Sequence, residues 1–543
     1  MSNSFSQEVF KADVVLVNGK IWTSEESPVW INSVAISQDK IIYAGDDKNV
    51  KPLIGKKTEV IDLKGKFVMP GFIDAHVHFV NGGFYILGVK LKDAKNEMEF
   101  AERIREKAMS LPEGAWILEG NWDNNNWPGG NLPAKELIDE YTEKNPVFVN
   151  RYDGHMALAN SLALKLAGIN KDTSSPVGGV IVKDPKTGEP TGILKDSAMN
   201  LVYKIIPEPD TKTSLIAVKK AVEEANRFGV TSVQDMGTLK DFKIYQRLRE
   251  KGELNVRISE RPPMAQWRKL YQAGILNLFG DDYLRISGLK AFVDGSVGSN
   301  TAWFFEPYIN QSENFGITMY PEGKLEKLII EVDKAGYSVS VHAIGDRANS
   351  FILNIFEKVI KENGKRDRRF KIEHAQHLKQ GDFKRYNLLD VIASVQPYHS
   401  IDDGRWVEER IGHKRCESSY AYKSFLEHGV KLAFGTDWPV APLNPLLSIY
   451  AAVTRRTLDD KYPEGWFPEQ KISLKDALLA YTINSAYAVF EENIKGSIKQ
   501  DKLADIVVLS ENLFEVAPDE IKDVKVIMTI LGGKIVYNQM SYD

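Results

Sequence analysis

Both ends of the chain contain short runs in which apolar and polar positions alternate, the pattern of half-buried strands. Near the start these runs are ADVVLVNGKIWT, SVAISQDKIIYAGD and TEVIDLKGKFVMPG, and the Asn-Gly, Gln-Asp-Lys and Lys-Gly breaks within them predict hairpins. ADIVVLSEN and VKVIMTILGGKIVYN repeat this pattern near the end. We therefore expect residues 1–69 and 488–543 to form one small composite β-sandwich.

The middle of the chain alternates strand-like and helix-like runs. Residues 324–336 and 349–364 have the apolar spacing of helices and end in glycine, as helices often do. Counting the run that ends at His78, eight strand-like runs are separated by such pieces, which predicts an α/β fold with a (β/α)₈ barrel over residues 70–487. The other seven runs are 229–237, 254–261, 283–296, 337–346, 369–376, 390–399 and 430–440.

One interval is too long for a single crossover between barrel strands. It lies between His78 and Gly229 and contains VGGVIVKDPKTGEPTGILKD, a hairpin pattern with a Pro-Lys-Thr-Gly turn. We expect residues 112–210 to form an insertion on the first loop. Loops after barrel strands lie at the catalytic end, so the insertion should cap the site.

Composition narrows the classes of function. The chain has 543 residues, 43% of them hydrophobic and 27% charged, with a net charge of −4, which is typical of a globular protein. No basic cluster indicates a nucleic-acid partner, and no apolar run reaches the roughly 20 residues of a membrane helix. We expect a small-molecule substrate, no nucleic-acid or membrane partner, and an oligomeric state that is open, a homodimer included.

The start of the chain bears on its cellular location, and the single cysteine limits the kinds of site that the chain can contain. Residues 1–13 lack the pattern of an export signal, so we expect a cytoplasmic location, or export if a signal preceded residue 1. Cys416 alone excludes an internal disulfide and cysteine-based zinc sites. Its basic neighbours predict an exposed or half-buried thiol in a loop.

Polar side chains stand at the ends of the predicted barrel strands, where barrel enzymes carry their chemistry. They are His76, His78, Lys290, His342, His374 and Asp437. Each has a plain alternative: a hydrogen-bonded histidine, a lysine reaching solvent, or an aspartate that caps a turn. In a strand, His76 and His78 point to the same side and can converge on one point.

Together these side chains favour a metal-dependent hydrolase. Imidazoles and a carboxylate suit Zn²⁺, Fe²⁺ or Mn²⁺, and a metal-bound water has a pKa near 7. A carboxylate beside that water can pass its proton to a leaving nitrogen. Serine-nucleophile and phosphate-loop motifs are absent from the sequence.

Longer motifs resemble the amidohydrolase superfamily of metal-dependent hydrolases, and within it the N-substituted formamide deformylase-like branch, amidohydrolase family 3. The matching stretches run from about residue 12 to 538. They are VMPGFIDAHVHF, GNWDNNNWPGG, RYDGHMALANSLAL, GVTSVQDMG, LKAFVDGSVGSNTAWF, VHAIGDRA, KIEHAQH, SVQPYH, FGTDWPVAP and GSIKQDKLADIVVLS.

The resemblance implies a distorted (β/α)₈ barrel and a site with one or two ions, most often zinc. His76 and His78 would hold the first metal, with Asp437 as ligand and general base. His342 and His374 would hold the second. Lys290 matches the position of a bridging carboxylated lysine, and burial beside cations lowers the pKa of a lysine as that modification requires. A one-metal site with unmodified Lys290 remains open.

Other residues of these motifs are candidates for substrate binding. Asp294 either orients Lys290 or caps a turn, and His399 either binds substrate or is structural. From the insertion the candidates are Trp122, Asp123, Arg151, Asp153 and His155, with a buried ion pair of Arg151 as the alternative.

These observations favour hydrolysis of a non-peptide C–N bond, amide or formamide-like, by metal-activated water. Deamination or lactone hydrolysis at a one-metal site is the alternative, and a non-catalytic binding protein is a third. Trp122, Trp127, Trp303 and Phe304 suggest room for an apolar substituent.

Overall fold

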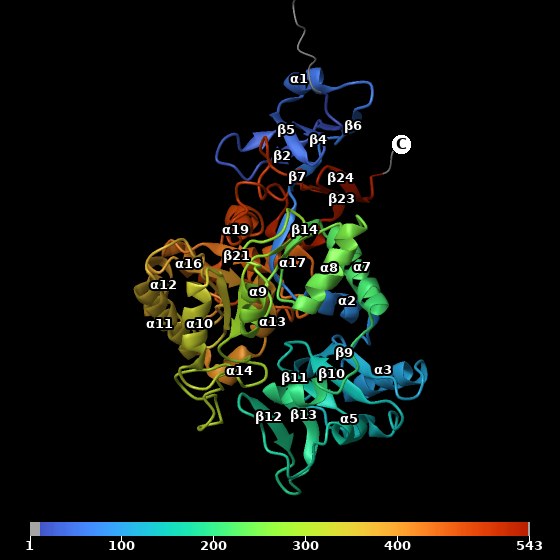
Figure 1. The fold of residues 1–543 in the computed structure, drawn as a ribbon, viewed down its shortest axis with the longest axis vertical. Coiled ribbons are helices and arrows are strands. Elements are labelled where there is room, and N and C mark those ends of the chain that lie inside the picture. The colour runs from blue at the N-terminus through green and yellow to red at the C-terminus, as the bar shows by residue number, and fades with distance from the viewer. Residues whose placement is uncertain (1–10, 541–543) are drawn as a thin grey trace, which may run out of the picture.

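The computed structural model describes residues 11–540. The first ten residues, where no export signal was expected, and the last three lie outside it, so those ends of the predicted terminal unit are not covered. Figure 1 shows an elongated molecule with a small β unit at one end, the α/β part in the middle and the inserted segment at the other end. No helix of the described residues is long and apolar enough to span a membrane.

The middle part is built from parallel strands in two sheets. In residues 11–540 one sheet has the order β16-β15-β14-β8 and the other β17-β18-β19-β20-β21. Isolated bridges join them at Val77–Trp438 and at Pro263–Lys290. The strands are β8 (Phe72–Val77), β14 (Val230–Asp235), β15 (Arg257–Glu260), β16 (Leu284–Ile286), β17 (Leu289–Phe292), β18 (Val339–Ala343), β19 (Lys371–His374), β20 (Ile392–Val395) and β21 (Leu432–Phe434).

Every predicted barrel run contains a strand, but residues 283–296 form two strands instead of one. β16 pairs with β15, whereas β17 pairs with β18 of the other sheet. The break falls at Gly288, whose φ of +145° is open mainly to glycine. The run therefore changes sheets at this residue, which its continuous apolar pattern could not reveal.

Helices cover the outside of these strands. In α11 the buried residues Ile352, Phe356 and Val359 recur at helical spacing, and the helix ends at Gly364, as expected. The helices of this part are α2 (Phe79–Leu87), α7 (Thr211–Arg227), α8 (Leu239–Glu250), α9 (Trp267–Gln272), α10 (Lys324–Lys334), α11 (Asp346–Asn363), α12 (Gln380–Leu388), α13 (Pro397–Asp403), α14 (Val407–Ile411), α15 (His413–Cys416), α16 (Tyr422–Glu427), α17 (Pro445–Thr454), α18 (Leu474–Ala480) and α19 (Ile483–Tyr487).

The prediction for Cys416 was wrong. The residue ends the short helix α15 and is fully buried, not exposed in a loop. It packs in the main apolar core, where its thiol serves as a small hydrophobic group.

Strands from both ends of the chain share one sheet. β22 pairs antiparallel with β7, so that Ile506 lies opposite Pro70. This sheet has the order β24-β23-β22-β7-β2-β3, and a second has the order β5-β4-β1-β6. The elements are β1 (Val14–Val17), β2 (Lys20–Trp22), β3 (Trp30–Ile31), β4 (Ser33–Ser37), β5 (Lys40–Gly45), α1 (Asp47–Val50), β6 (Glu59–Asp62), β7 (Phe67–Pro70), β22 (Ile506–Leu509), β23 (Val526–Leu531) and β24 (Lys534–Asn538).

The inserted segment has its own sheet and its own core. The sheet has the order β12-β13-β11-β10-β9, and the predicted hairpin at residues 177–196 forms β12 and β13. Its elements are β9 (Ile117–Trp122), α4 (Glu136–Asp139), β10 (Val147–Arg151), β11 (Met156–Ala159), α5 (Ser161–Leu166), β12 (Gly179–Lys183), β13 (Pro190–Asp196) and α6 (Asn200–Tyr203). The helix α3 (Glu97–Met109) precedes the expected range 112–210 but packs in the same core.

Candidate metal centre

The strands β8 and β21 bring two histidines and an aspartate together. His76 lies on β8, His78 follows it, and Asp437 comes three residues after β21. The Nε2 atoms of His76 and His78 lie 3.3 and 3.2 Å from Oδ1 of Asp437. The two histidines thus converge on one carboxylate oxygen, the geometry expected from their spacing.

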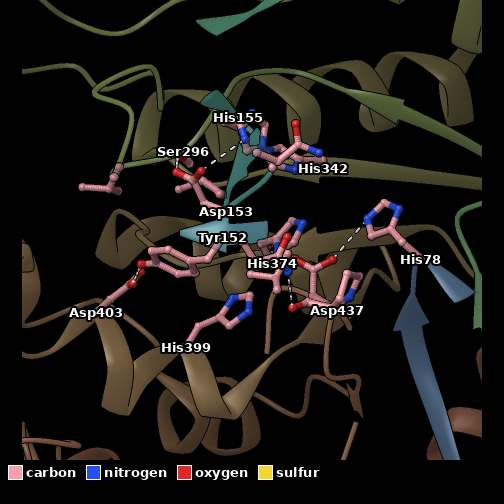
Figure 2. A pocket seen from close by; sticks show the side chains of 18 of the residues that line it. His78, Tyr152, Asp153, His155, Ser296, His342, His374, His399, Asp403 and Asp437 are labelled. Atoms are coloured by element: carbon pink, nitrogen blue, oxygen red, sulfur yellow. Dashed lines mark hydrogen bonds and ion pairs between the residues drawn. The ribbon is translucent and has the colours of Figure 1, made fainter. Parts of the chain in front are cut away.

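A second group shares the same aspartate. The ligand atoms of His374 on β19, His399 on α13 and Asp437 all lie within 4.8 Å of one another, and all three residues are buried. Nδ1 of His374 and Nε2 of His399 have no hydrogen-bond partner. Buried polar atoms without partners are costly, so these atoms fit a bound divalent cation. Figure 2 shows His78, His374 and His399 around Asp437.

Lys290 and His342 line the same cavity in different roles. Nζ of Lys290 lies 3.4 Å from Nε2 of His76. The ring of His342 lies 4.5 Å from that of His374, but Nε2 of His342 contacts the carbonyl oxygen of Gly295 at 3.1 Å. The second group contains His399, for which a substrate contact and a structural role were both expected, and does not contain His342.

Burial and neighbouring charges set the protonation states of this centre. Burial, and then the nearby Lys290, lower the pKa of His76 to about 4 against the opposing effect of Glu373 and Asp437. Burial also lowers the pKa of Lys290 to about 8. For Asp437, burial opposes ionisation, but His76 and His78 hold its pKa below the usual range. Neutral imidazoles and an ionised carboxylate are the states that bind a cation.

Glu373 is a candidate positioning residue that the sequence analysis missed. Its Oε2 lies 2.7 Å from Nδ1 of His76, and its Oε1 accepts a hydrogen bond from Arg261 at 3.1 Å. A carboxylate on the far nitrogen of a ligating histidine fixes the tautomer and orientation of the ring. The signal was present, because a carboxylate inside the buried strand KIEH requires a buried partner.

Asp294 anchors loops next to the centre. Its carboxylate accepts hydrogen bonds from the backbone N–H groups of Trp303, Ile344 and Gly345 at 2.8, 3.0 and 2.9 Å. It lies 3.5 Å from Nε2 of His342. The geometry agrees with the turn-capping alternative and differs from the expected contact with Lys290.

Two of the insertion candidates reach the cavity. Nδ1 of His155 lies 2.6 Å from Asp196, and its ring lies 5.1 Å from that of His342. Asp153 accepts a hydrogen bond from Ser296 at 2.6 Å. Figure 2 shows both side chains on the wall of the pocket that carries His342.

The other three insertion candidates lie behind the pocket wall, which corrects the expectation of direct substrate contact. Arg151 is buried between Asp153 and Asp123, at 2.8 and 3.3 Å, so the ion-pair alternative applies. Trp122 donates its Nε1–H to the carbonyl oxygen of Val149 and stacks on Trp127. The indole belongs to the core of the inserted segment because β9 continues through Trp122.

The pocket itself is a cavity of about 220 Å³. Trp303 and Phe304 are not among the residues that line it, although other aromatic side chains, such as Phe292 and Trp406, are. Tyr152 and Asp403 line it instead, and the Tyr152 hydroxyl donates to Asp403 at 3.3 Å. The wall therefore combines polar groups with aromatic and aliphatic side chains, and the expected room for an apolar substituent stays a prediction.

Comparisons with known proteins find relatives over almost the whole chain. The sequence pattern of the amidohydrolase family matches residues 59–537. The chain is 40% identical to Protein LONG AFTER FAR-RED 3 of Arabidopsis thaliana, over 97% of this chain and 92% of that protein. It is 26% identical to N-substituted formamide deformylase of Arthrobacter pascens, over 97% and 98%.

A solved structure shares the fold. An uncharacterized metal-dependent hydrolase from Pyrococcus horikoshii superposes with a TM-score of 0.75 at 29% identity, covering 93% of this chain and 99% of that one. The chain belongs to the amidohydrolase family.

Proposed function

We propose that this chain uses the metal-dependent hydrolysis of its family to cleave a non-peptide C–N bond, of amide or formamide type, in a small molecule. The observation that carries the proposal is the shared carboxylate of Asp437, which joins both candidate metal groups. The similarity to N-substituted formamide deformylase over almost the whole chain supports the choice of bond. The small cavity supports a small substrate.

We also infer the finer architecture that places this site. The bridges Val77–Trp438 and Pro263–Lys290 support closure of the two parallel sheets into one distorted barrel. The pairing of β22 with β7 supports a composite β-sandwich made from both ends of the chain. Residues 112–210 would then cap the catalytic end of the barrel.

The metal would be held by histidines and one carboxylate. His76, His78 and Asp437 would bind one ion, and His374 and His399 a second, with zinc the best match to this donor set. A divalent ion there would activate water as a nucleophile and polarise a carbonyl group.

The protein's own residues would handle the protons. Asp437 is held ionised, so it can accept a proton from the attacking water and deliver it to the leaving nitrogen. Glu373 keeps His76 in one orientation. Lys290, with a pKa near 8, has a neutral fraction at physiological pH, which capture of CO₂ as a carbamate requires.

Deamination or lactone hydrolysis at a one-metal site is the second candidate. One observation favours it. Nε2 of His342 contacts the carbonyl oxygen of Gly295, so this atom is not directed at the second metal that the family resemblance implies. A metal-to-protein ratio near one, with no carbamate on Lys290, would support it.

Activity measurements on the Asp437→Asn variant test the proposal. We expect hydrolysis of a responsive formamide or amide to fall at least 100-fold, because the general base is lost. Metal content should be largely retained, because the Asn oxygen can still coordinate. A screen of formamides, amides and lactones supplies the substrate, and full activity of Asp437→Asn would refute the role of the carboxylate.

A further inference from the structure

The wall of the same pocket carries further polar residues that belong to neither candidate metal group. Asn81 of α2, Glu119 of β9, Asn150 of β10 and Tyr203 of α6 line it. Tyr203 is 43% exposed, and Asn81 is also exposed, so this region lies where the cavity opens to solvent. We call these four residues the mouth group.

Glu119 differs from the other carboxylates of the pocket because it has no partner. Asp153, Asp403 and Asp437 are each hydrogen-bonded or ion-paired within the protein. Within residues 11–540, the carboxylate of Glu119 makes no hydrogen bond and no ion pair. A half-buried carboxylate on a cavity wall is therefore left to interact with what enters the cavity.

The backbone holds Glu119 in an unfavourable conformation. Its φ is +70°, and that of Asn121 is +54°, both in the left-handed region that side chains rarely adopt. Its stem packs against Gly88, where an added Cβ would lie 3.0 Å from Cβ of Glu119. Strained positions of this kind concentrate at ligand-binding sites, where the surrounding structure maintains them.

The surroundings of Glu119 supply acceptors for a cation. The Tyr203 hydroxyl donates to Oδ1 of Asn150 at 3.0 Å, which leaves the hydroxyl oxygen free to accept. Lys90, the cation that acts electrostatically on Glu119, lies over the Tyr85 ring and donates to the carbonyl oxygen of Tyr85. Burial raises the pKa of Glu119 to about 7, and Lys90 offsets this only in part.

We propose that the mouth group binds a positively charged amino group at the far end of the substrate, with Glu119 as its counter-ion. This rests on the proposed function, since it assigns the ammonium group to an amide whose C–N bond is cleaved at the metal end of the cavity. An ammonium has three donors, which the Glu119 carboxylate, the Tyr203 hydroxyl and the Asn81 amide oxygen can accept. Glu119 is thus a specificity residue for a cationic amide.

Binding of amines tests the mouth group without any hydrolysis. Calorimetry would compare diamines of three to six carbons with monoamines of matched length at pH 7.5. We expect the wild-type chain to bind at least one diamine about tenfold more tightly than the matched monoamine. Glu119→Gln should lose this preference, and Glu140→Gln, which alters an exposed glutamate of the same segment, should keep it.

Turnover separates this inference from the proposed function. For N-formyl diamines and matched N-formyl alkylamines, we expect the ratio of kcat/KM to favour the diamines about tenfold in the wild type and to fall in Glu119→Gln. If diamines bind in a Glu119-dependent way but no formamide is hydrolysed, the proposed function fails and the mouth group stands. A wild-type chain without diamine preference, or a Glu119→Gln chain that retains it, would overturn the mouth group.

Discussion

At the scale of residues, the centre combines unusual backbone with buried charge. His374 and Asp437 have φ values of +72° and +60°, in the left-handed region. Such a conformation costs roughly 1–2 kcal/mol for a residue other than glycine. Asp74 anchors the second of these turns, since its carboxylate accepts hydrogen bonds from the N–H groups of His76 and Thr436. The fold thus maintains strained turns that aim ligand atoms at one point.

The Glu373→Gln variant tests how the first histidine is oriented. The amide cannot provide the charge that holds Nδ1 of His76, so we expect zinc affinity to fall about 10- to 100-fold. Equilibrium dialysis against a competing chelator measures this affinity. Ser340→Ala removes a neighbouring hydrogen bond to Glu373 without touching His76 and should stay near the wild-type value. Unchanged zinc affinity in Glu373→Gln would show that the contact is only structural.

Much of the centre could be predicted from the sequence, because the carboxyl ends of parallel strands lie at the same edge and bring their side chains together. His76, His78 and Asp437 needed only strand periodicity and the position of their strands. His399 could not be placed with them, because its contact depends on the turn into α13. Trp122 and Arg151 were expected to contact the substrate but are buried behind the residues that line the pocket. A sequence motif does not show whether a residue faces the cavity or the protein interior. The direct role of each proposed ligand stays a prediction.

At the scale of elements, the ends of β14 and β15 bury two carboxylates side by side. A Cβ added at Gly237 would lie 2.7 Å from oxygens of both Asp235 and Glu260. The Tyr245 hydroxyl donates to Asp235, whereas neither oxygen of Glu260 has a hydrogen-bond partner. The two carboxylates meet because of the register between β14 and β15. The alternation of strands and helices in the sequence predicts the strands but not their register.

The pair predicts a pH-dependent stability. Burial, and then Asp235 and Asp241, raise the pKa of Glu260 well above its ordinary 4.5. The folded chain therefore keeps a proton that the unfolded chain releases, so this stabilisation is complete below about pH 4.5 and is lost as the pH rises through the folded pKa. Glu260→Gln is neutral throughout, so its thermal midpoint relative to wild type should increase from pH 5 to 8.5.

The control for this prediction is Glu250→Gln, which alters an exposed glutamate at the end of α8. Its thermal midpoint should follow that of the wild type at every pH. Parallel curves for Glu260→Gln and the wild type would mean that Glu260 does not keep a proton in the folded chain.

At the scale of the whole molecule, the site depends on a segment with a separate core. The length of the interval between His78 and Gly229 predicts an insertion at residues 112–210, and Figure 1 shows this segment at one end of the molecule. Trp122, Trp127 and Phe100 are buried in its core, and Tyr152 lines the pocket. The backbone N–H of Tyr152 donates to the carbonyl oxygen of Trp122 at 3.0 Å, so core and wall are joined.

Trp122→Ala tests this dependence. Loss of a fully buried indole should destabilise the inserted segment by about 3–5 kcal/mol. We expect faster limited proteolysis within residues 112–210 and weaker binding of small ligands to the pocket. Leu166→Ala, at a position 53% exposed in the same segment, should change stability by about 0.5 kcal/mol or less. Equal proteolysis of Trp122→Ala and the wild type would contradict a cooperative inserted core.

The central claim is that histidines from distant parts of the chain hold divalent metal around Asp437. The most direct measurement is the metal content of the chain after reconstitution with Zn²⁺ and removal of free metal, by mass spectrometry of the elements. We predict one or two ions per wild-type chain and at least one fewer in the folded His76→Ala/His78→Ala double variant. A wild-type chain without stoichiometric metal, or a double variant with the full content, would contradict the account.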